Sequence, residues 1–204
     1  MSGIVAQNIN KQSGLIKAPE GGTGAWTFIS KSTASSSDDI SITSGLDDTY
    51  VQYLITCKDV HCSGDDSSFQ WNGSIDAGSN YNVSKTMVAW KARHNEADSV
   101  ASFVELQNLA NATTFMHCVE GCGNDNDQAQ AGYIHLFNPS STTFVKHFLY
   151  DFSGYRHADT AVHILGGGYF NTTSDIDAVQ FKMTSGTIDV GDFCLYGLTK
   201  WVEL

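Results

Sequence analysis

Residues 177–198 read DAVQFKMTSGTIDVGDFCLYGL, and this stretch decides the fold class because apolar and polar side chains alternate along most of it. Successive side chains of a β-strand point to opposite faces of the sheet, so a period of two predicts strands here. Ser185-Gly186 lies between the two runs and has the chemistry of a tight turn. We therefore expect a β-hairpin whose strands are residues 177–184 and 187–198.

The same alternation recurs along the chain from Trp26 onward. It is visible in residues 26–31, 39–43, 50–57, 86–91, 113–119, 133–137 and 144–150. Roughly ten strands, separated by turn residues and without a convincing long helix, predict an all-β domain over residues 25–204. The expected architecture is an antiparallel β-sandwich of jelly-roll type. A short helix fits only residues 96–109, and Gly166-Gly167-Gly168 predicts a bend or a bulge.

Residues 1–24, MSGIVAQNINKQSGLIKAPEGGTG, follow neither a strand period nor a helix period and end in a glycine cluster. Their net charge is +1, which leaves −12 on the rest of a chain whose total is −11. An extended cationic arm in front of an acidic body predicts a segment that docks on another protein, and a frayed terminus is the alternative. The docking side chains would be Ile4, Val5, Ile9, Leu15 and Ile16.

The composition is that of one folded domain, with 204 residues, of which 41% are apolar and 16% charged. No apolar run approaches the ~20 residues that span a bilayer, and the opening MSGIVAQNINKQ has no visible secretory signal. We therefore expect no membrane insertion. The net charge of −11 repels phosphate backbones and disfavours nucleic acid as a partner. No motif predicts a cofactor.

Four of the five cysteines occur in the paired patterns CKDVHC (Cys57 and Cys62) and HCVEGC (Cys118 and Cys122). These pairs could supply four zinc ligands if two strand ends met, but their spacing is not the two-residue knuckle of zinc ribbons. An odd number of cysteines argues against a complete disulfide framework. Buried free thiols are the favoured interpretation, and a zinc site or one disulfide are the alternatives.

Other patterns point only weakly to chemistry. The loop at residues 123–128 carries Asp125 and Asp127, whose oxygens could hold calcium, but the spacing of an EF-hand is missing and a solvated turn is favoured. No Gly-x-Ser-x-Gly elbow and no local Ser-His-Asp signature is present. Two carboxylates of a glycoside hydrolase cannot be chosen from sequence, because their separation depends on the tertiary structure. We expect a protein that is not an enzyme, with a depolymerising enzyme as a minor alternative.

Two aromatic residues are candidates for contact with a sugar ring. Trp71 precedes Asn72-Gly73, a turn signal, and is therefore the tryptophan expected to be exposed. Tyr81 would complete the platform with it. Trp90 lies in an apolar run and is expected in the core.

Several long phrases resemble virion structural proteins of tailed phages, especially phages of marine bacteria. They are GYIHLFNPSSTTFVKHF (132–148), GYFNTTSDIDAVQFKM (168–183) and SGTIDVGDFCLYG (185–197). In that group a β-rich body ends in a phrase of the type G-x-I-x-x-G-x-x-x-L-Y-G. The openings SGIVAQN (2–8) and SGLIKAPEGG (13–22) are similar to the same group.

The resemblance implies a non-enzymatic component of the virion. We expect a subunit of a tail fibre or spike-like appendage that contacts the host surface, with a capsid decoration protein or a glycan-binding β-sandwich module as alternatives. Such appendages are commonly homotrimers, so the expected partners are two further copies, other virion proteins bound through residues 1–24, and a host-surface glycan.

Overall fold

The computed structural model describes residues 26–199, which form twelve β-strands joined by turns and loops. The strands are β1 (Trp26–Ser37), β2 (Asp39–Ile42), β3 (Tyr50–Cys62), β4 (Ser67–Ser74), β5 (Lys85–Asn95), β6 (Ala101–Ala112), β7 (Met116–Cys122), β8 (Gln130–Phe137), β9 (Lys146–Arg156), β10 (Thr160–Phe170), β11 (Ala178–Met183) and β12 (Ile188–Thr199). Within this range there is no helix and all strand pairs are antiparallel, so the predicted all-β class is confirmed. The predicted arm, residues 1–24, lies outside the described residues.

Strand pairing follows a nested order along the chain. β1, β2, β3 and β4 pair in turn with β12, β11, β8 and β7, so the first four strands meet later strands in reverse order. Two hairpins, β5–β6 and β9–β10, are inserted into this arrangement, and β10 pairs with β5 to join them. Because β9 also pairs with β8, the inserted hairpins extend the sheet that contains β1, β12, β3 and β8.

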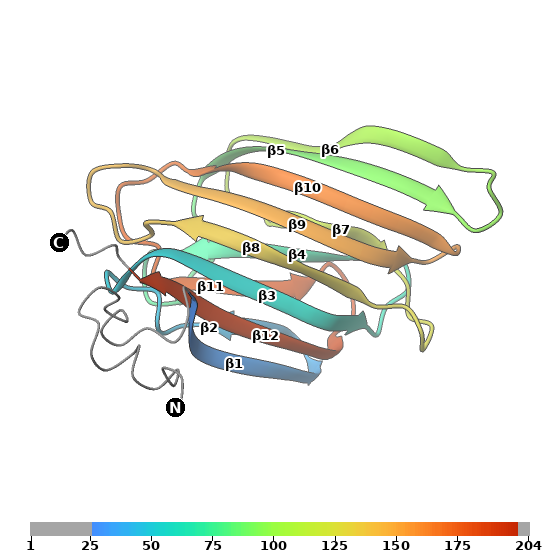
Figure 1. Ribbon diagram of the computed structural model, residues 1–204, viewed down its shortest axis with the longest axis horizontal. Helices are drawn as coiled ribbons and strands as arrows, with labels where there is room; N and C mark the ends of the chain where they lie inside the picture. The colour runs from blue at the N-terminus through green and yellow to red at the C-terminus, as the bar shows by residue number, and fades with distance from the viewer. Residues whose placement is uncertain (1–25, 200–204) are drawn as a thin grey trace, which may run out of the picture.

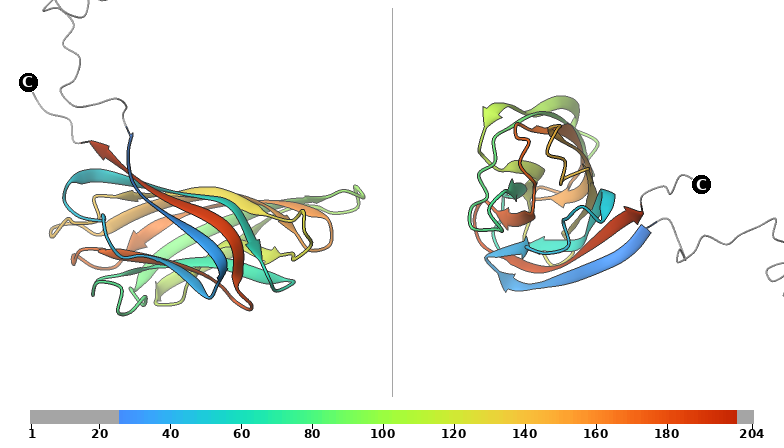
Figure 2. Two further views of the ribbon diagram at one scale, coloured as in Figure 1. Left: turned by 90° about the horizontal axis from the view of Figure 1, so that it is seen from below. Right: turned by 90° about the vertical axis from the view of Figure 1, so that its left-hand side faces the viewer.

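Two layers result, as Figure 1 shows. The larger layer runs β1-β12-β3-β8-β9-β10-β5-β6, and the smaller layer, β7-β4-β11-β2, lies behind it. One edge strand of the smaller layer, β7, is joined to the larger layer where Cys122 pairs with Arg156 on β9. The other edge strand, β2, follows β1 of the larger layer after a single residue, Asp38. The sheet therefore almost closes on itself into a flattened barrel, seen from one end in Figure 2.

Aromatic side chains fill the space between the layers. Phe69 on β4 stacks on Phe181 of β11, with 5.7 Å between ring centroids, and meets Phe152 of β9 edge-on at 5.8 Å. Trp71, also on β4, is fully buried and contacts Phe170 of β10 edge-on at 5.8 Å. Each such pair contributes about 0.5–1.5 kcal/mol beyond the burial of area, so these rings hold the smaller layer against the larger one.

The hairpin predicted at Ser185-Gly186 is wrong. β11 lies between β4 and β2 in the smaller layer, whereas β12 lies between β1 and β3 in the larger layer. The chain crosses between layers here, with Gly186 at a left-handed φ of 72°. A hydrogen bond from Ser63 N to Thr187 O, 3.1 Å long, ties this crossing to the loop between β3 and β4. The residues of a hairpin turn serve a layer crossing equally well, so composition does not distinguish the two.

The helix predicted as fitting residues 96–109 is also wrong, because most of this stretch belongs to β6. The register of β5 with β6 shifts between Ala89 and Trp90, and this bulge disturbs the alternation of exposed and buried side chains along β6. Phe103 and Val104 are adjacent in sequence and both exposed. A search for a period of two therefore misses this strand.

The glycines at 166–168 form neither a bend nor a bulge. They continue β10 in unbroken register with β9 and β5. Gly166 lies against the buried ring of Tyr150, and a Cβ on this residue would overlap that ring. Close packing, rather than a turn, explains the glycine here.

Candidate functional site

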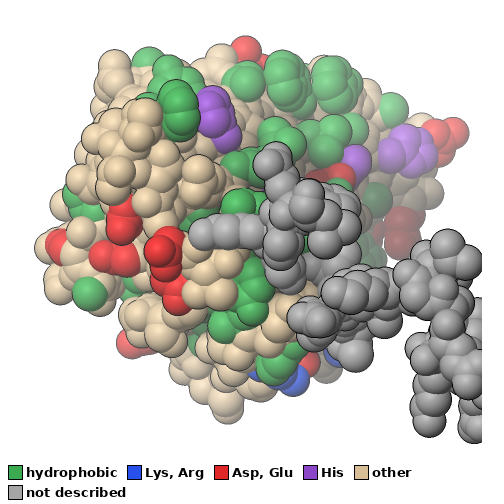
Figure 3. Space-filling model, turned by 60° about the vertical axis from the view of Figure 1, so that its left-hand side comes forward, with side chains coloured by type: hydrophobic (Ala, Val, Ile, Leu, Met, Phe, Trp, Pro, Cys, Tyr) green, Lys and Arg blue, Asp and Glu red, His purple; other side chains and the backbone are tan. Residues whose placement is uncertain are grey.

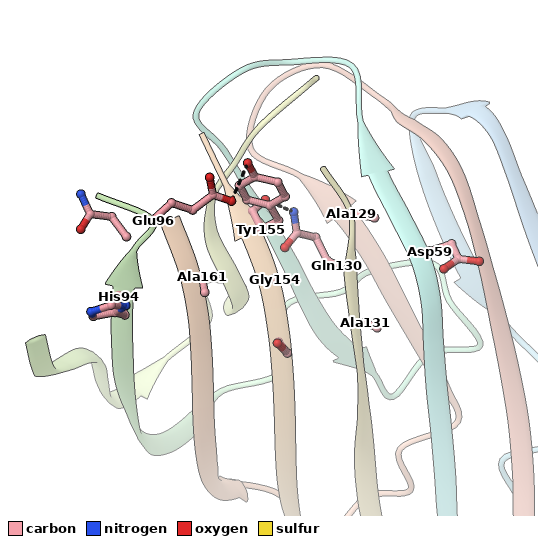
Figure 4. A pocket seen from close by; sticks show the side chains of 11 residues that line it. Asp59, His94, Glu96, Ala129, Gln130, Ala131, Gly154, Tyr155 and Ala161 are labelled. Atoms are coloured by element: carbon pink, nitrogen blue, oxygen red, sulfur yellow. Dashed lines mark hydrogen bonds between the residues drawn. The ribbon is translucent and has the colours of Figure 1, made fainter. Parts of the chain in front are cut away.

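A hollow of about 540 Å³ opens on the outer face of the larger layer. It lies where β3, β5 and β9 approach their ends and β8 and β10 begin, and Figure 4 shows its lining from close by. The lining includes Asp59, Glu96, Ala131, Tyr155 and Ala161. Residues far apart in the sequence thus meet at one end of the sheet.

Small side chains form the floor of the hollow. Ala131 on β8 lies opposite Ser153 on β9, and Ala161 lies on β10 next to β9. Further along the same strands the exposed side chains are large, with Tyr133 on β8 and Leu165 on β10. The hollow therefore results from a change in side-chain size along a continuous sheet.

Hydrogen bonds hold one side of the rim. The backbone N–H of Glu96 donates to Asp159 O at 3.1 Å, which ties the turn after β5 to the turn after β9. The Tyr155 hydroxyl donates to Asp159 Oδ1 at 3.1 Å and lies 3.5 Å from Glu96 Oε1 (Figure 4). The hydrogen bond to Asp159 raises the pKa of Tyr155 to about 12, so the phenol stays protonated and fixed in place.

Asp59 reaches the other side of the rim through a β-bulge. The register of β3 with β8 shifts between Cys57 and Val60, and Asp59 takes a left-handed φ of 52°. Bulges redirect side chains, and non-glycine residues seldom hold this conformation, so the site is a point of local strain. Lys58 Nζ lies 3.0 Å from Asp59 Oδ2, which gives this carboxylate a cationic partner.

A second hollow, of about 430 Å³, adjoins the first and also includes Asp59 in its lining. His61, Asp127 and Asp189 line it as well. His61 Nδ1 lies 3.5 Å from Asp189 Oδ2, and His61 Nε2 lies 3.1 Å from the backbone oxygen of Asp125. The imidazole therefore already has partners on both ring nitrogens.

The residues weighed from the sequence as alternative zinc and calcium ligands do not assemble into a metal site. Within residues 26–199 no group of three or more His, Cys, Asp or Glu side chains is arranged to hold a metal ion. Asp125 and Asp127, the alternative calcium ligands, are exposed, and their loop closes as a turn through Gln128 N and Asp125 O at 2.9 Å.

The four paired cysteines are buried and free, as favoured from the sequence. Burial raises the pKa of the Cys57 and Cys118 thiols well above their ordinary value. Cys62 and Cys122 are hydrogen-bonded to each other, which lowers the pKa of Cys62 and raises that of Cys122. Cys62 Sγ also donates to the backbone oxygen of Gly123 at 3.1 Å. These thiols pack within the core and do not form the proposed four-ligand zinc site.

The predicted sugar platform is not formed by Trp71 and Tyr81. Trp71 is fully buried, because the Asn72-Gly73 signal belongs to β4 and not to a turn. Asn72 Nδ2 donates to Tyr81 O at 2.7 Å and to Thr113 O at 3.0 Å, so this side chain anchors two loops to the strand. Tyr81 is half-buried and its hydroxyl is enclosed.

Exposed aromatic side chains lie instead on the outer face of the larger layer. The ring of His135 on β8 contacts Trp26, Tyr133 and Phe137, with centroid separations of 5.9, 5.3 and 6.1 Å. Trp90 on β5, expected in the core, is 42% exposed. In Figure 3 hydrophobic side chains lie beside histidines on the surface. Both faces of these strands carry apolar residues, so sequence alternation does not identify the outer one.

An aspartate and a histidine pair on the outer face between the aromatic cluster and the hollow. His163 Nε2 lies 2.6 Å from Asp151 Oδ1, and both side chains are partly exposed. Ser153 is opposite His163 in the strand register. Among the hydrogen bonds of the described residues, none joins the Ser153 hydroxyl to this imidazole, so the three side chains form no activated nucleophile.

Sequence analysis missed the residues that line the hollow, because only strand register brings them together. Glu96 and Tyr155 belong to no motif, and Asp59 falls in the CKDVHC pattern only as an intervening residue. The one signal in the sequence is the presence of the small residues Ala129, Ala131 and Gly132 around the start of β8. Small residues on an exposed strand leave room above the sheet.

No protein-family model, curated protein or solved structure matches this chain. Within residues 26–199 no helix is long and apolar enough to cross a membrane.

Proposed function

We propose that this chain is a non-enzymatic structural subunit of a tailed-phage virion, part of a tail fibre or spike-like appendage that contacts the host surface. The three long phrases that resemble virion proteins, residues 132–148, 168–183 and 185–197, fall within the body, on β8, β9, the end of β10, β11 and β12 and their flanking loops. The observation that carries the proposal is the nested pairing of β1, β2, β3 and β4 with β12, β11, β8 and β7.

A nested order of this kind is what a jelly roll has, in which one long hairpin of eight strands is rolled into two sheets. We propose that the body is a jelly roll into which the β5–β6 and β9–β10 hairpins are inserted. Jelly rolls occur in viral capsid and lectin domains, which supports a particle component by analogy. A fold hosts many functions, so the position of the hollow on the body also has to fit a role in the particle.

The two ends of the body support outward display. Trp26 pairs with Leu198, and Leu198 pairs with Gln52 near the start of β3. Asp59 lies seven residues further along β3, or roughly 23 Å at 3.3 Å per residue. The hollow is thus at the opposite end of the strands from the point where β1 begins and β12 ends (Figure 1).

In this proposal residues 1–24 attach the subunit to other virion proteins, and the body is displayed as one unit of a homotrimer. The charge contrast between the arm, at +1, and the rest, at −12, supports the division of roles. A capsid decoration protein would use the same arm and body. A free-standing glycan-binding module is the second candidate, favoured by the hollow and by the partly exposed aromatic cluster around His135.

Deletion of residues 1–20 tests the attachment. We expect the truncated protein to be absent from gradient-purified particles, measured by immunoblot, while its thermal unfolding matches that of the full chain. Incorporation at the wild-type level would contradict the role of the arm. Absence of the full-length protein from purified particles would overturn the virion assignment in favour of the glycan-binding module.

A further inference from the structure

We propose that the hollow lined by Asp59, Glu96, Ala131, Tyr155 and Ala161 binds an uncharged sugar residue. This inference deepens the host-contact part of the proposed function and rests on it for its biological setting. The binding itself is a property of the isolated body and is tested there.

The rim presents hydrogen-bond acceptors to a ligand. Glu96 is exposed, and its Oε1 lies 3.5 Å from the Tyr155 hydroxyl, whose proton is donated to Asp159. Carboxylates bind hydroxyl groups through strong charge-assisted hydrogen bonds, and their two oxygens can accept from neighbouring hydroxyls. The Tyr155 hydroxyl is already committed to Asp159, which orients the ring at the edge of the hollow. A ligand rich in hydroxyl donors matches this set.

The charge of the hollow excludes an anionic sugar. Among the described residues that line it there is no lysine or arginine, and the chain outside the arm carries a net charge of −12. A uronic or sialic acid would therefore meet like charge, and the lysine next to the rim, Lys58, is already paired with Asp59.

An existing ion pair reduces the attraction for a cation. Asp59 is paired with Lys58 at 3.0 Å, so this carboxylate of the rim already has a cation beside it. Glu96 is then the principal carboxylate left for the ligand. One exposed carboxylate favours neutral hydroxyls over the repeated positive charges of a polyamine.

The floor and the size fit a sugar ring. Ala131 and Ala161 give a low apolar surface on which the C–H face of a pyranose can lie, and Ser153 adds a hydroxyl without raising the floor. A volume of about 540 Å³ lies in the range of small-molecule sites.

Saturation-transfer NMR and calorimetry on the full chain test the inference. The probes are the methyl glycosides of glucose, galactose, mannose and N-acetylglucosamine, with glucuronic acid, glucosamine and putrescine as charged probes. We expect at least one neutral glycoside to bind and the charged probes to bind at least ~10-fold more weakly. Binding of none of the neutral glycosides, or tighter binding of glucosamine or putrescine, would overturn the inference.

Two variants, each with a matched control, test whether the sugar binds at the hollow. Ala131→Phe fills the hollow from an exposed position, and Thr27→Phe adds the same ring to an exposed position on β1. Glu96→Gln removes the acceptor charge, and Glu105→Gln makes the same change on β6, away from the hollow. We expect each hollow variant to weaken binding at least ~10-fold and each control to leave it unchanged. Equal effects of variant and control, in proteins with unchanged thermal unfolding, would contradict the site.

The two proposals can fail separately. If the sugar binds at the hollow but the protein is absent from purified particles, the virion assignment fails and the sugar site stands. If particles contain the protein but no neutral glycoside binds, the sugar site fails and the virion assignment stands.

Discussion

The side-chain amide of Gln107 on β6 pairs with the backbone beside His117 on β7. Its Oε1 accepts the backbone N–H of His117 at 3.0 Å, and its Nε2 donates to the backbone oxygen of Phe115 at 3.3 Å. A neighbouring strand would make the same two kinds of hydrogen bond. β6 otherwise pairs only with β5, so this side chain couples the inserted hairpins to the smaller layer.

We expect Gln107→Ala to lower the free energy of unfolding by about 1–3 kcal/mol, because the N–H of His117 on β7 and the carbonyl of Phe115 just before it lose their partner. Urea unfolding followed by circular dichroism measures the loss. Asn108→Ala, at the exposed neighbouring position, is the control and should change the free energy by less than about 0.5 kcal/mol. Equal losses in the two variants would show that Gln107 does not bridge the strands.

Trp71→Ala is expected to lower the free energy of unfolding by about 3–5 kcal/mol, because a fully buried ring leaves a cavity between the layers. Trp90→Ala removes an indole that is 42% exposed and should cost about 1 kcal/mol or less. Thermal and urea unfolding of both variants measure the contrast. A stable Trp71→Ala protein would place Trp71 outside the core.

Lys85 should make stability depend on pH. Its side chain is fully buried and Nζ donates to Thr114 O at 2.6 Å; burial lowers its pKa from 10.5 to about 7. Between pH 7 and 10.5 the unfolded chain holds a proton on this group that the folded chain lacks, so its contribution to the free energy of unfolding rises with pH.

Comparison with Lys85→Met isolates this contribution. The variant has no titratable group at this position, so its stability does not gain the contribution that Lys85 makes as pH rises. The free energy of unfolding of the variant, measured by urea unfolding, should therefore fall relative to that of the wild type between pH 7 and pH 10. Lys31→Met, which removes a lysine at an exposed position, is the control, and the fall should be steeper for Lys85→Met. A flat difference for Lys85→Met would mean that the amine is protonated in the fold.

Thiol reactivity should separate Cys194 from the other cysteines. Cys57, Cys62, Cys118 and Cys122 are buried, whereas Cys194 is partly exposed. Thiolates are the reactive form and need access to the reagent. We expect a disulfide reagent to modify one thiol quickly in the folded protein and all five after unfolding. In Cys194→Ser no fast phase should remain, and a persisting one would reveal an accessible thiol among the other four.

Some features followed from local sequence patterns. The alternation in residues 50–57 and 133–137 correctly predicted strands, since one buried face imposes a period of two wherever a strand lies on a core. The burial of Cys57 and Cys118 followed from the same parity. The exposed position predicted for Trp71 is wrong, because Asn72 Nδ2 donates to the backbone oxygens of two loops and keeps that stretch in β4.

By itself, the sequence determined that this chain folds as antiparallel strands with thiols inside and an acidic surface. Only the tertiary structure decided that β11 and β12 part into different layers and that Asp59, Glu96 and Tyr155 meet around one hollow. The physical reason is that every residue except proline offers a strand the same backbone N–H and C=O groups. Which strand becomes the neighbour is therefore settled by the packing of the whole core, and strand neighbours determine which side chains meet on the surface.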